Sequence, residues 1–300
     1  MTKISGSITA LITPFLDEPG KPPGAVLDED RYRSLIERQL KAGTHGLVAV
    51  GTTGESATLS HREHKHLISI CVETVAGRAP VIAGAGSNAT SEAIEIAQHA
   101  EDAGADALLT VTGYYNKPSQ AGLIAHYRAL HENTTLPIIL YNVPGRTRSE
   151  LSIETIAELS TLERIVGVKD ATGDLARVAL QRVASGPDFI QLSGEDMTAV
   201  GFNAMGGRGC IGVTANVAPA LCAEMHEACA RGDYSSAIEI QDQLAPLHDA
   251  LFADTSPGPV KYAMSVLGLC EPTTRLPLVE PPEDVKAQLR RALKHAGLID

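Results

Sequence analysis

What the sequence lacks narrows the classes of protein to which it can belong. It has no block of basic residues, and its formal net charge is −11 with a pI near 5.4. This balance argues against a nucleic-acid partner and against a membrane-surface partner. No run is long and apolar enough for a signal peptide or a membrane span. We therefore expect a cytoplasmic protein without a membrane partner.

Paired cysteines and repeated segments are also lacking. The cysteines form no CxxC pair and their number is odd, which suits free thiols in a reducing compartment better than a disulfide framework. We expect all of them to be packing residues: Cys71, Cys210, Cys222, Cys229 and Cys270. No internal repeat and no low-complexity tract interrupts the chain.

What the sequence does contain is a series of eight short apolar runs, separated by amphipathic helical patterns. Such an alternation, at a spacing of roughly 20 to 40 residues, predicts a (β/α)8 TIM barrel, with a doubly wound open sheet as the competing fold. The composition does not change before residue 220 or so, which favours one closed domain. The expected strands are residues 7–12, 46–50, 81–84, 107–111, 137–141, 165–169, 189–192 and 210–213.

After the eighth run the strand signals stop, and only helical patterns follow. They cover residues 219–231, 234–251, 260–267 and 283–296. We expect the first of them to complete a barrel domain at 1–231. The others would form a C-terminal helical appendix at 232–300, packed on the barrel or on a neighbouring subunit. The Pro- and Gly-rich stretch 17–24 is predicted to be a surface loop.

The sixth run ends in Lys169, and a cation at that position needs a reason. One interpretation is a lysine that extends to solvent or pairs with Asp170. The other is an amine kept neutral in a dry pocket, able to attack a carbonyl and form a Schiff base. Lowering the pKa from ~10.4 to ~8 by desolvation would raise the neutral fraction at pH 7 from about 0.04 % to roughly 10 %.

Other chemistry-bearing segments follow other strands, and the carboxyl ends of barrel strands form the usual active-site face. Residues 51–56 form a Gly-framed turn that could hold a carboxylate or could be a plain capped turn. Tyr114 and Tyr115 follow the fourth strand, and Tyr141 and Arg146 mark the exit of the fifth. A tyrosine can shuttle protons beside a lysine, and an arginine can bind a carboxylate bidentately.

Two further patterns are weak motifs. Residues 207–212 match GxGxxG, but they enter the last strand instead of linking a strand to a helix, so close packing explains the glycines better than a dinucleotide site. The His-rich segment 61–66 lacks the HExxH order and an evident third ligand. We therefore expect no bound metal.

Five segments, in their order and spacing, resemble the dihydrodipicolinate synthase family of pyruvate-dependent class I aldolases. The resemblance covers nearly the whole chain, although related motifs occur in N-acetylneuraminate lyases and keto-deoxy-sugar aldolases. It implies condensation of pyruvate with L-aspartate 4-semialdehyde in lysine biosynthesis, without an external cofactor, by a homotetramer built as a dimer of tight dimers. The segments are GTTGES at 51–56, YYNKPSQ at 114–120, YNVPGRT at 141–147, GVKDATGD at 167–174 and GVTANVAP at 212–219.

The resemblance also implies catalytic roles for four residues. Lys169 would form the imine with the ketone of pyruvate. Tyr141 would be the general acid and base beside that imine. The Thr52 hydroxyl would link Tyr141 to Tyr115, which in the family reaches across a dimer interface.

Three residues match substrate-binding positions of the family. Thr53 would hold the carboxylate of pyruvate, Arg146 would hold the carboxylate of the semialdehyde, and the backbone of Ile211 would face the substrate. Sugar-acid lyases of the superfamily generally lack the arginine. The alternatives are therefore a sugar-acid aldolase and, outside enzymes, a catalytically silent barrel that senses pyruvate or lysine.

A further set matches the family's allosteric pocket for L-lysine at the tight-dimer interface. Its acidic member, Glu92, would pair with the ammonium group of the ligand, and the alternative is a plain polar interface. The matching residues are Ser56, Ala57, His61, His64, Asn88, Glu92 and Tyr114. Two residues depart from the family: Gly113 replaces a usual proline and predicts a looser loop, and Arg148 replaces a common glycine.

Overall fold

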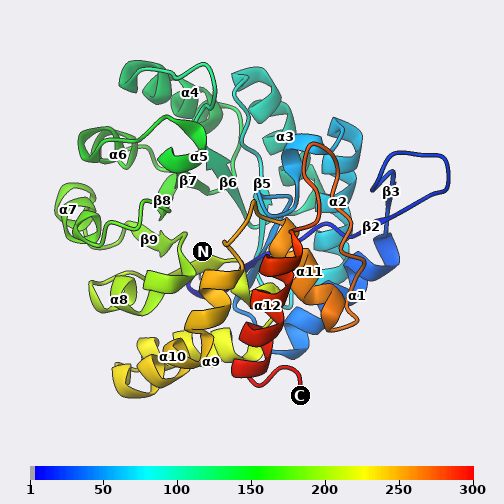
Figure 1. The fold of residues 1–300 in the computed structure, drawn as a ribbon. Coiled ribbons are helices and arrows are strands. Elements are labelled where there is room, and N and C mark those ends of the chain that lie inside the picture. Colours follow the sequence, from blue (N-terminus) through cyan, green and yellow to red (C-terminus); the bar gives the residue numbers. More distant parts are fainter. Residues whose placement is uncertain (1–3) are drawn as a thin grey trace.

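The computed structural model describes residues 4–300, in which eight parallel strands close into a barrel (Figure 1). The strands are β1 (Gly6–Ala10), β4 (Gly46–Ala49), β5 (Val81–Gly84), β6 (Ala107–Val111), β7 (Ile138–Asn142), β8 (Ile165–Asp170), β9 (Ile190–Ser193) and β10 (Gly209–Gly212). Because β1 pairs with both β4 and β10, the sheet has no edge. The predicted TIM barrel is therefore confirmed over the doubly wound sheet. Residues 1–3 of the expected barrel range lie outside the described residues.

Helices alternate with the strands and surround them. They are α1 (Glu29–Lys41), α2 (His61–Val75), α3 (Thr90–Ala103), α4 (Gln120–Glu132), α5 (Pro144–Thr147), α6 (Ile153–Leu159), α7 (Ala176–Ser185), α8 (Ala199–Ala204) and α9 (Pro219–Ala230). Short 3₁₀ turns are η1 (Ser56–Thr58), η2 (Asp196–Thr198) and η3 (Thr214–Asn216). Local sequence sets the helix ends: the Ser152 hydroxyl accepts from Thr155 N at the start of α6, and Gly104 ends α3 with a φ of +86°.

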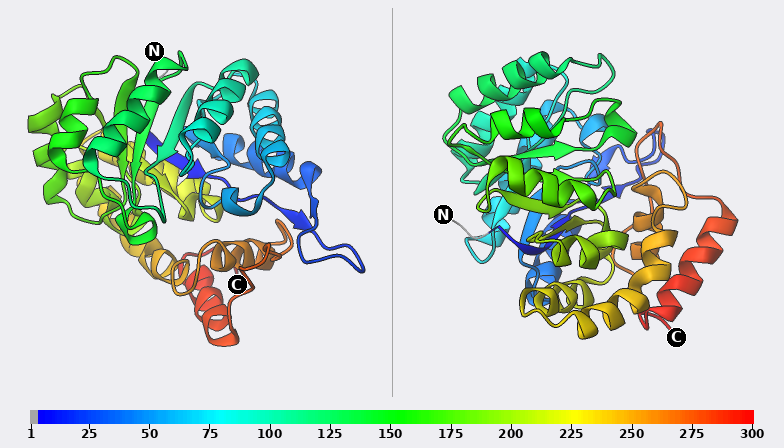
Figure 2. Two further views of the ribbon diagram at one scale, coloured as in Figure 1. Left: turned by 90° about the horizontal axis from the view of Figure 1, so that it is seen from above. Right: turned by 90° about the vertical axis from the view of Figure 1, so that its left-hand side faces the viewer.

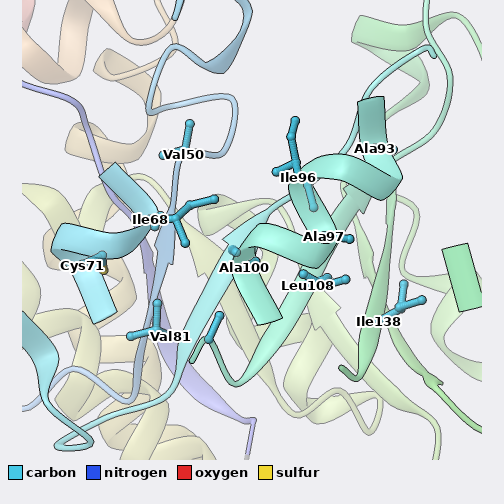
Figure 3. Close-up of a cluster of buried hydrophobic side chains, with 14 of the residues drawn as sticks. Val50, Ile68, Cys71, Val81, Ala93, Ile96, Ala97, Ala100, Leu108 and Ile138 are labelled. Atoms are coloured by element: carbon cyan, nitrogen blue, oxygen red, sulfur yellow. The ribbon is translucent and has the colours of Figure 1, made fainter. Parts of the chain in front are cut away.

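The largest hydrophobic cluster lies between the strands and the surrounding helices (Figure 3). Val81, Leu108 and Ile138 point outward from β5, β6 and β7, and Ile68 of α2 and Ala97 of α3 pack in the same layer. Each aliphatic side chain buried there stabilises the fold by roughly 1.5–3 kcal/mol, before conformational entropy is subtracted. Since both faces of each strand are covered, the strands read as continuous apolar runs.

A second cluster fills the inside of the barrel. It contains Ile8, Val48, Ile139 and Leu192, which alternate along their strands with the outward-facing residues. Tyr141 belongs to this inner cluster, at the carboxyl end of β7. The barrel is thus packed below its carboxyl end, and chemistry is confined to its mouth.

Three helices follow the barrel: α10 (Tyr234–Ala250), α11 (Gly258–Val266) and α12 (Glu283–His295). They lie together at one end of the barrel (Figure 2), and their hydrophobic core includes Ile12 and Val213, which follow β1 and β10. The expected C-terminal helices are confirmed, with ends shifted by up to two residues. The division into two domains after residue 231 stays a prediction.

A two-stranded antiparallel ribbon, β2 (Phe15–Leu16) and β3 (Val26–Leu27), flanks the predicted loop 17–24. Strands of two residues have no readable period, so the sequence did not indicate this ribbon. The loop lies against the C-terminal segment, where Arg275 Nε donates to Gly24 O at 2.8 Å.

All five cysteines are buried and unpaired, as expected for packing residues. Within residues 4–300, no helix has the length and apolar character needed to cross a membrane.

Candidate active site

Lys169 and Tyr141 lie side by side at the carboxyl ends of neighbouring strands. They are paired in the register of β7 and β8, and Lys169 Nζ lies 4.2 Å from the centroid of the Tyr141 ring. Both are buried, at 6 % and 7 % exposure. A Cβ placed on Gly194 would lie 3.0 Å from Lys169 Cε, so the glycine makes room for the lysine side chain.

Asp170 does not serve as the partner of Lys169. Its carboxylate accepts from Arg177 Nε at 2.9 Å and from Gln181 Nε2 at 2.7 Å, both on α7. Thr172 donates two further hydrogen bonds to Asp170 Oδ1, from its N at 3.0 Å and from its Oγ1 at 2.6 Å. Among residues 4–300, no carboxylate lies within salt-bridge distance of Lys169. The interpretation of Lys169 as a surface or ion-paired cation therefore does not fit the geometry.

The turn after β4 lies at the same end of the barrel. Two backbone hydrogen bonds of 3.0 Å close it, from Gly54 N to Gly51 O and from Glu55 N to Thr52 O. Thr53 is buried, whereas Thr52 is exposed. The turn thus presents one hydroxyl to solvent and encloses the other.

The predicted proton relay is not assembled within one chain. Tyr115 is 90 % exposed and adopts a left-handed backbone with a φ of +66°. Within the described residues, the hydroxyls of Tyr141, Thr52 and Tyr115 make no hydrogen bonds to one another. The relay through these groups, with Tyr115 reaching across a dimer interface, therefore stays a prediction.

Arg146 and Ile211 occupy different surroundings. Arg146 lies on α5, directly after β7, and is exposed, with no ion-pair partner among residues 4–300. Ile211 is fully buried in β10 and belongs to the inner cluster of the barrel. The guanidinium of Arg146 is thus accessible to an anionic ligand. The side chain of Ile211 is taken up by the barrel core, which leaves its backbone for contact with a ligand.

The two departures from the family pattern have local explanations. Arg148 ends α5 with a left-handed φ of +58°, which accounts for the glycine common there. Gly113 is buried, and a Cβ on it would lie 3.0 Å from Pro118 Cγ. The glycine therefore lies in close contact with Pro118, while the expected looser loop stays untested.

Two acidic residues at the exit of β9 were missed by the sequence analysis. Burial raises the pKa of Glu195, the neighbouring Asp196 raises it further, and Lys169 opposes the shift. Asp196 is buried, and its Oδ2 accepts from Val213 N at 2.8 Å and from Thr214 N at 3.3 Å. Asp196 thus fixes the chain at the end of β10, beside Ile211. Their position directly after a strand was the signal that could have found them.

The residues matched to the lysine pocket come from η1, α2, α3 and the loops after β5 and β6. Glu92 Oε2 accepts from Ser87 Oγ at 2.8 Å and lies 3.9 Å from His61 Nε2. His64 is buried, and its Nε2 bonds to Gly84 O at 2.7 Å. His61 and Glu92 are thus brought together, whereas His64 is tied to the barrel backbone.

The buried His64 makes the fold sensitive to acid. Burial lowers its pKa to about 4, so between pH 6.5 and 4 the unfolded chain binds more protons than the folded chain. Stability is therefore lost as the pH falls through this window, by up to roughly 3 kcal/mol for this group. We expect His64→Gln to reduce the loss of unfolding free energy between pH 7 and 4.5, measured by urea denaturation. If the unfolding free energy of the variant falls as steeply over this pH range, His64 is not the group responsible.

The glycines of the GxGxxG match at residues 207–212 behave as packing residues. Gly209 has a φ of +147°, and a Cβ on it would lie 2.2 Å from Gly6 O; a Cβ on Gly212 would meet Asp196 Oδ1 at 2.1 Å. Close packing thus explains these glycines, and Gly209 lies at the amino-terminal end of β10, away from the mouth. In residues 4–300, no group of three or more His, Cys, Asp or Glu side chains is arranged to hold a metal ion.

Comparison with known proteins gives consistent matches over the full length. The model of the dihydrodipicolinate synthetase family matches residues 3–296. The 4-hydroxy-tetrahydrodipicolinate synthase of Parvibaculum lavamentivorans is 57 % identical over 295 residues, which are 98 % of this chain and 99 % of that protein.

Two solved structures are similar over nearly the whole chain. The chloride-inhibited dihydrodipicolinate synthase from Acinetobacter baumannii, complexed with pyruvate, has a TM-score of 0.95 and 43 % identity, covering 99 % of this chain and 100 % of that one. The enzyme from Cyanidioschyzon merolae with lysine bound has a TM-score of 0.92 and 38 % identity, covering 98 % and 99 %.

Proposed function

Because the chain belongs to the dihydrodipicolinate synthetase family and has 4-hydroxy-tetrahydrodipicolinate synthase activity, we propose that Lys169 is the residue that forms an imine with pyruvate. The observation that carries this assignment is the position of Lys169 Nζ. It is buried at the barrel mouth, lies against the Tyr141 ring and has no carboxylate partner among residues 4–300. An amine in such a place is poised for attack on a carbonyl.

The reaction follows from the chemistry of that amine. Lys169 Nζ attacks the ketone carbon of pyruvate, and the ketone oxygen leaves as water. The protonated imine draws electrons from the adjacent methyl group, which loses a proton to give an enamine. The enamine carbon attacks the aldehyde of L-aspartate 4-semialdehyde. The amine of the semialdehyde then attacks the imine carbon, closes the ring and releases Lys169, so no external cofactor is needed.

Proton transfers need a group beside the imine, and we assign that role to Tyr141. The centroid of its ring lies 4.2 Å from Lys169 Nζ, and the two residues come from adjacent, paired strands. The hydroxyl of Thr52 would connect the hydroxyl of Tyr141 with that of Tyr115 from a second copy. The 90 % exposure of Tyr115 supports this role, since the side chain has room to enter a partner's site.

Substrate binding would use the groups around Lys169. Thr53 and the backbone of its turn would hold the carboxylate of pyruvate. The similar structure from Acinetobacter baumannii is a complex with pyruvate. Arg146 would hold the carboxylate of the semialdehyde, and the backbone near Ile211 would face the substrate. The exposed, unpaired state of Arg146 among the described residues supports its part.

The proposed assembly is a homotetramer built as a dimer of tight dimers, in the cytoplasm. The 90 % exposure of Tyr115 supports the tight dimer, in which this side chain would enter the partner's site. Leu180 and Val183 are exposed apolar side chains on α7, of a kind that oligomers bury. Sedimentation analysis should give a tetramer mass, and a monomer with full activity would refute both the assembly and the relay.

We also propose feedback inhibition by L-lysine, at a site formed by His61, Glu92 and the other residues matched to the family's lysine pocket. Lysine is bound in the Cyanidioschyzon merolae relative, and here Glu92 supplies an anion for an ammonium group. We expect millimolar L-lysine to slow turnover of pyruvate and semialdehyde, followed through added dihydrodipicolinate reductase by loss of NADPH absorbance.

The same coupled assay tests the role of Glu92. Glu92→Gln keeps the shape but removes the charge, so the lysine concentration for half inhibition should rise about tenfold, the loss of one charge-assisted contact. Activity without lysine should be retained. Activity of the unmodified protein that does not change up to millimolar lysine would remove the proposal.

A further inference from the structure

A buried ion pair joins the C-terminal segment to the turn that carries Thr52 and Thr53. Lys261 of α11 donates from Nζ to Glu55 Oε1 at 2.5 Å, and both side chains are 0 % exposed. The two residues are 206 positions apart in sequence. A fully buried charge pair is costly to desolvate, so its presence calls for a role beyond stability.

Every polar group of the pair is satisfied by the C-terminal segment or by the β2–β3 ribbon. Lys261 Nζ also donates to Thr273 O at 2.8 Å and lies 4.0 Å from the centroid of the Phe15 ring. The second oxygen of Glu55 accepts from Arg275 N at 3.0 Å. Glu55 is therefore held from two sides in one position.

Arg275 fixes the segment that follows the turn. Its guanidinium binds Glu63 of α2 bidentately, at 2.9 Å and 2.6 Å, and donates to Thr58 O at 3.1 Å. These hydrogen bonds to Arg275 are the main cause of a Glu63 pKa lowered to about 2. The chain is thus clamped both at Glu55 and at the start of α2.

The turn itself has little freedom once Glu55 is fixed. Glu55 has a left-handed φ of +57°, and its N donates to Thr52 O. On the other side, Thr13 Oγ1 donates to Gly54 O at 2.7 Å, and a Cβ on Gly54 would lie 3.1 Å from Val50 Cα. A shift of the Glu55 side chain would therefore move the backbone that carries Thr53.

We propose that Lys261 is a positioning residue, which acts through Glu55 to hold Thr53 where it binds the carboxylate of pyruvate. The C-terminal helices thereby contribute to the active site without contacting the substrate. This inference rests on the proposed role of Thr53, and it predicts a selective effect on pyruvate. Arg146, proposed for the semialdehyde, lies on α5 and makes no hydrogen bond or ion pair with Glu55 or Lys261 among residues 4–300.

The test is the Lys261→Met variant, which removes the charge with little change in volume. We expect KM for pyruvate to rise about tenfold, the effect of losing roughly one hydrogen bond to its carboxylate. KM for the semialdehyde should change less than about twofold, a split that a general loss of stability would not produce. A folded Lys261→Met protein with a normal KM for pyruvate would overturn the proposal.

Leu289→Ala is the control for destabilisation. Leu289 is fully buried in the core of the C-terminal helices and takes no part in the ion-pair network. We expect this variant to lower the melting temperature without changing KM for pyruvate, and a similar rise in KM would overturn the proposal.

If Lys261→Met fails to fold, the double variant Glu55→Gln with Lys261→Met leaves no unpaired charge. It should fold and still show the raised KM, since the amide loses the contact with residue 261 and can keep only the hydrogen bond from Arg275 N. A normal KM would refute the inference. Borohydride trapping of pyruvate on Lys169 in the unmodified protein separates the two proposals. If no imine can be trapped, the proposed active site is wrong. If the imine is trapped but the variant has a normal KM for pyruvate, only the proposed role of Lys261 is wrong.

Discussion

Lys169→Met should lower kcat in the coupled assay by at least about 10³-fold, because no other group can form the imine that makes the pyruvate methyl group acidic. Methionine matches the length of the lysine stem and can lie against Tyr141 and Gly194 as the lysine does. Removing a buried polar group that has no carboxylate partner among residues 4–300 should leave the melting temperature unchanged or raised. Loss of activity in a well-folded protein is therefore the expected result.

Lys294→Met is the matched control for this experiment. Lys294 is an exposed lysine in the last turn of α12, and its loss should change neither turnover nor stability. Residual turnover of Lys169→Met within tenfold of the unmodified protein would place the nucleophile elsewhere.

Arg146→Ala should lower kcat/KM for L-aspartate 4-semialdehyde by about 10²-fold, the loss of a bidentate contact worth roughly 2–3 kcal/mol. The effect follows from the position of Arg146, which is exposed on α5 beside the strand that carries Tyr141. Imine formation with pyruvate should be retained, because Arg146 makes no hydrogen bond with Lys169 or Thr53 among residues 4–300. The measurement is the coupled assay with the semialdehyde varied at saturating pyruvate.

Arg148→Ala supplies the matched control for Arg146→Ala. Arg148 is an exposed arginine two positions on, at the left-handed end of α5, and has no proposed part in binding. It should retain kcat/KM for the semialdehyde. If Arg146→Ala loses imine trapping and use of the semialdehyde equally, the substitution disturbs the active site as a whole. Such a result would contradict a selective role of Arg146 in binding the semialdehyde.

The barrel could be predicted from the sequence because each of its strand–helix units leaves a regular hydrophobic pattern. Parallel strands covered on both faces give apolar runs, and each run is followed by an amphipathic helix that ends at a residue such as Gly104. The β2–β3 ribbon could not be predicted, since strands such as Phe15–Leu16 are too short to show alternation. The comparisons confirm the family and the activity that the five motifs indicated.

The candidate active site could be predicted only in part from the sequence. Lys169 was singled out by its place at a strand exit, and its role was implied by the resemblance. Whether it pairs with Asp170 depended on Arg177 and Gln181, which lie on the next helix. Lys261 looked like any lysine in a helical pattern, and its burial against Glu55 comes from tertiary packing across 206 positions. Contacts of this kind carry no local signal.

The most direct test of the account is to trap the imine. The protein is incubated with pyruvate, reduced with borohydride and digested with trypsin, and the peptides are analysed by mass spectrometry. The account predicts one reduced pyruvyl group on Lys169, in a peptide spanning residues 165–177 that trypsin no longer cuts at that lysine, and no adduct without pyruvate. An adduct on another lysine, or none at all, would contradict it.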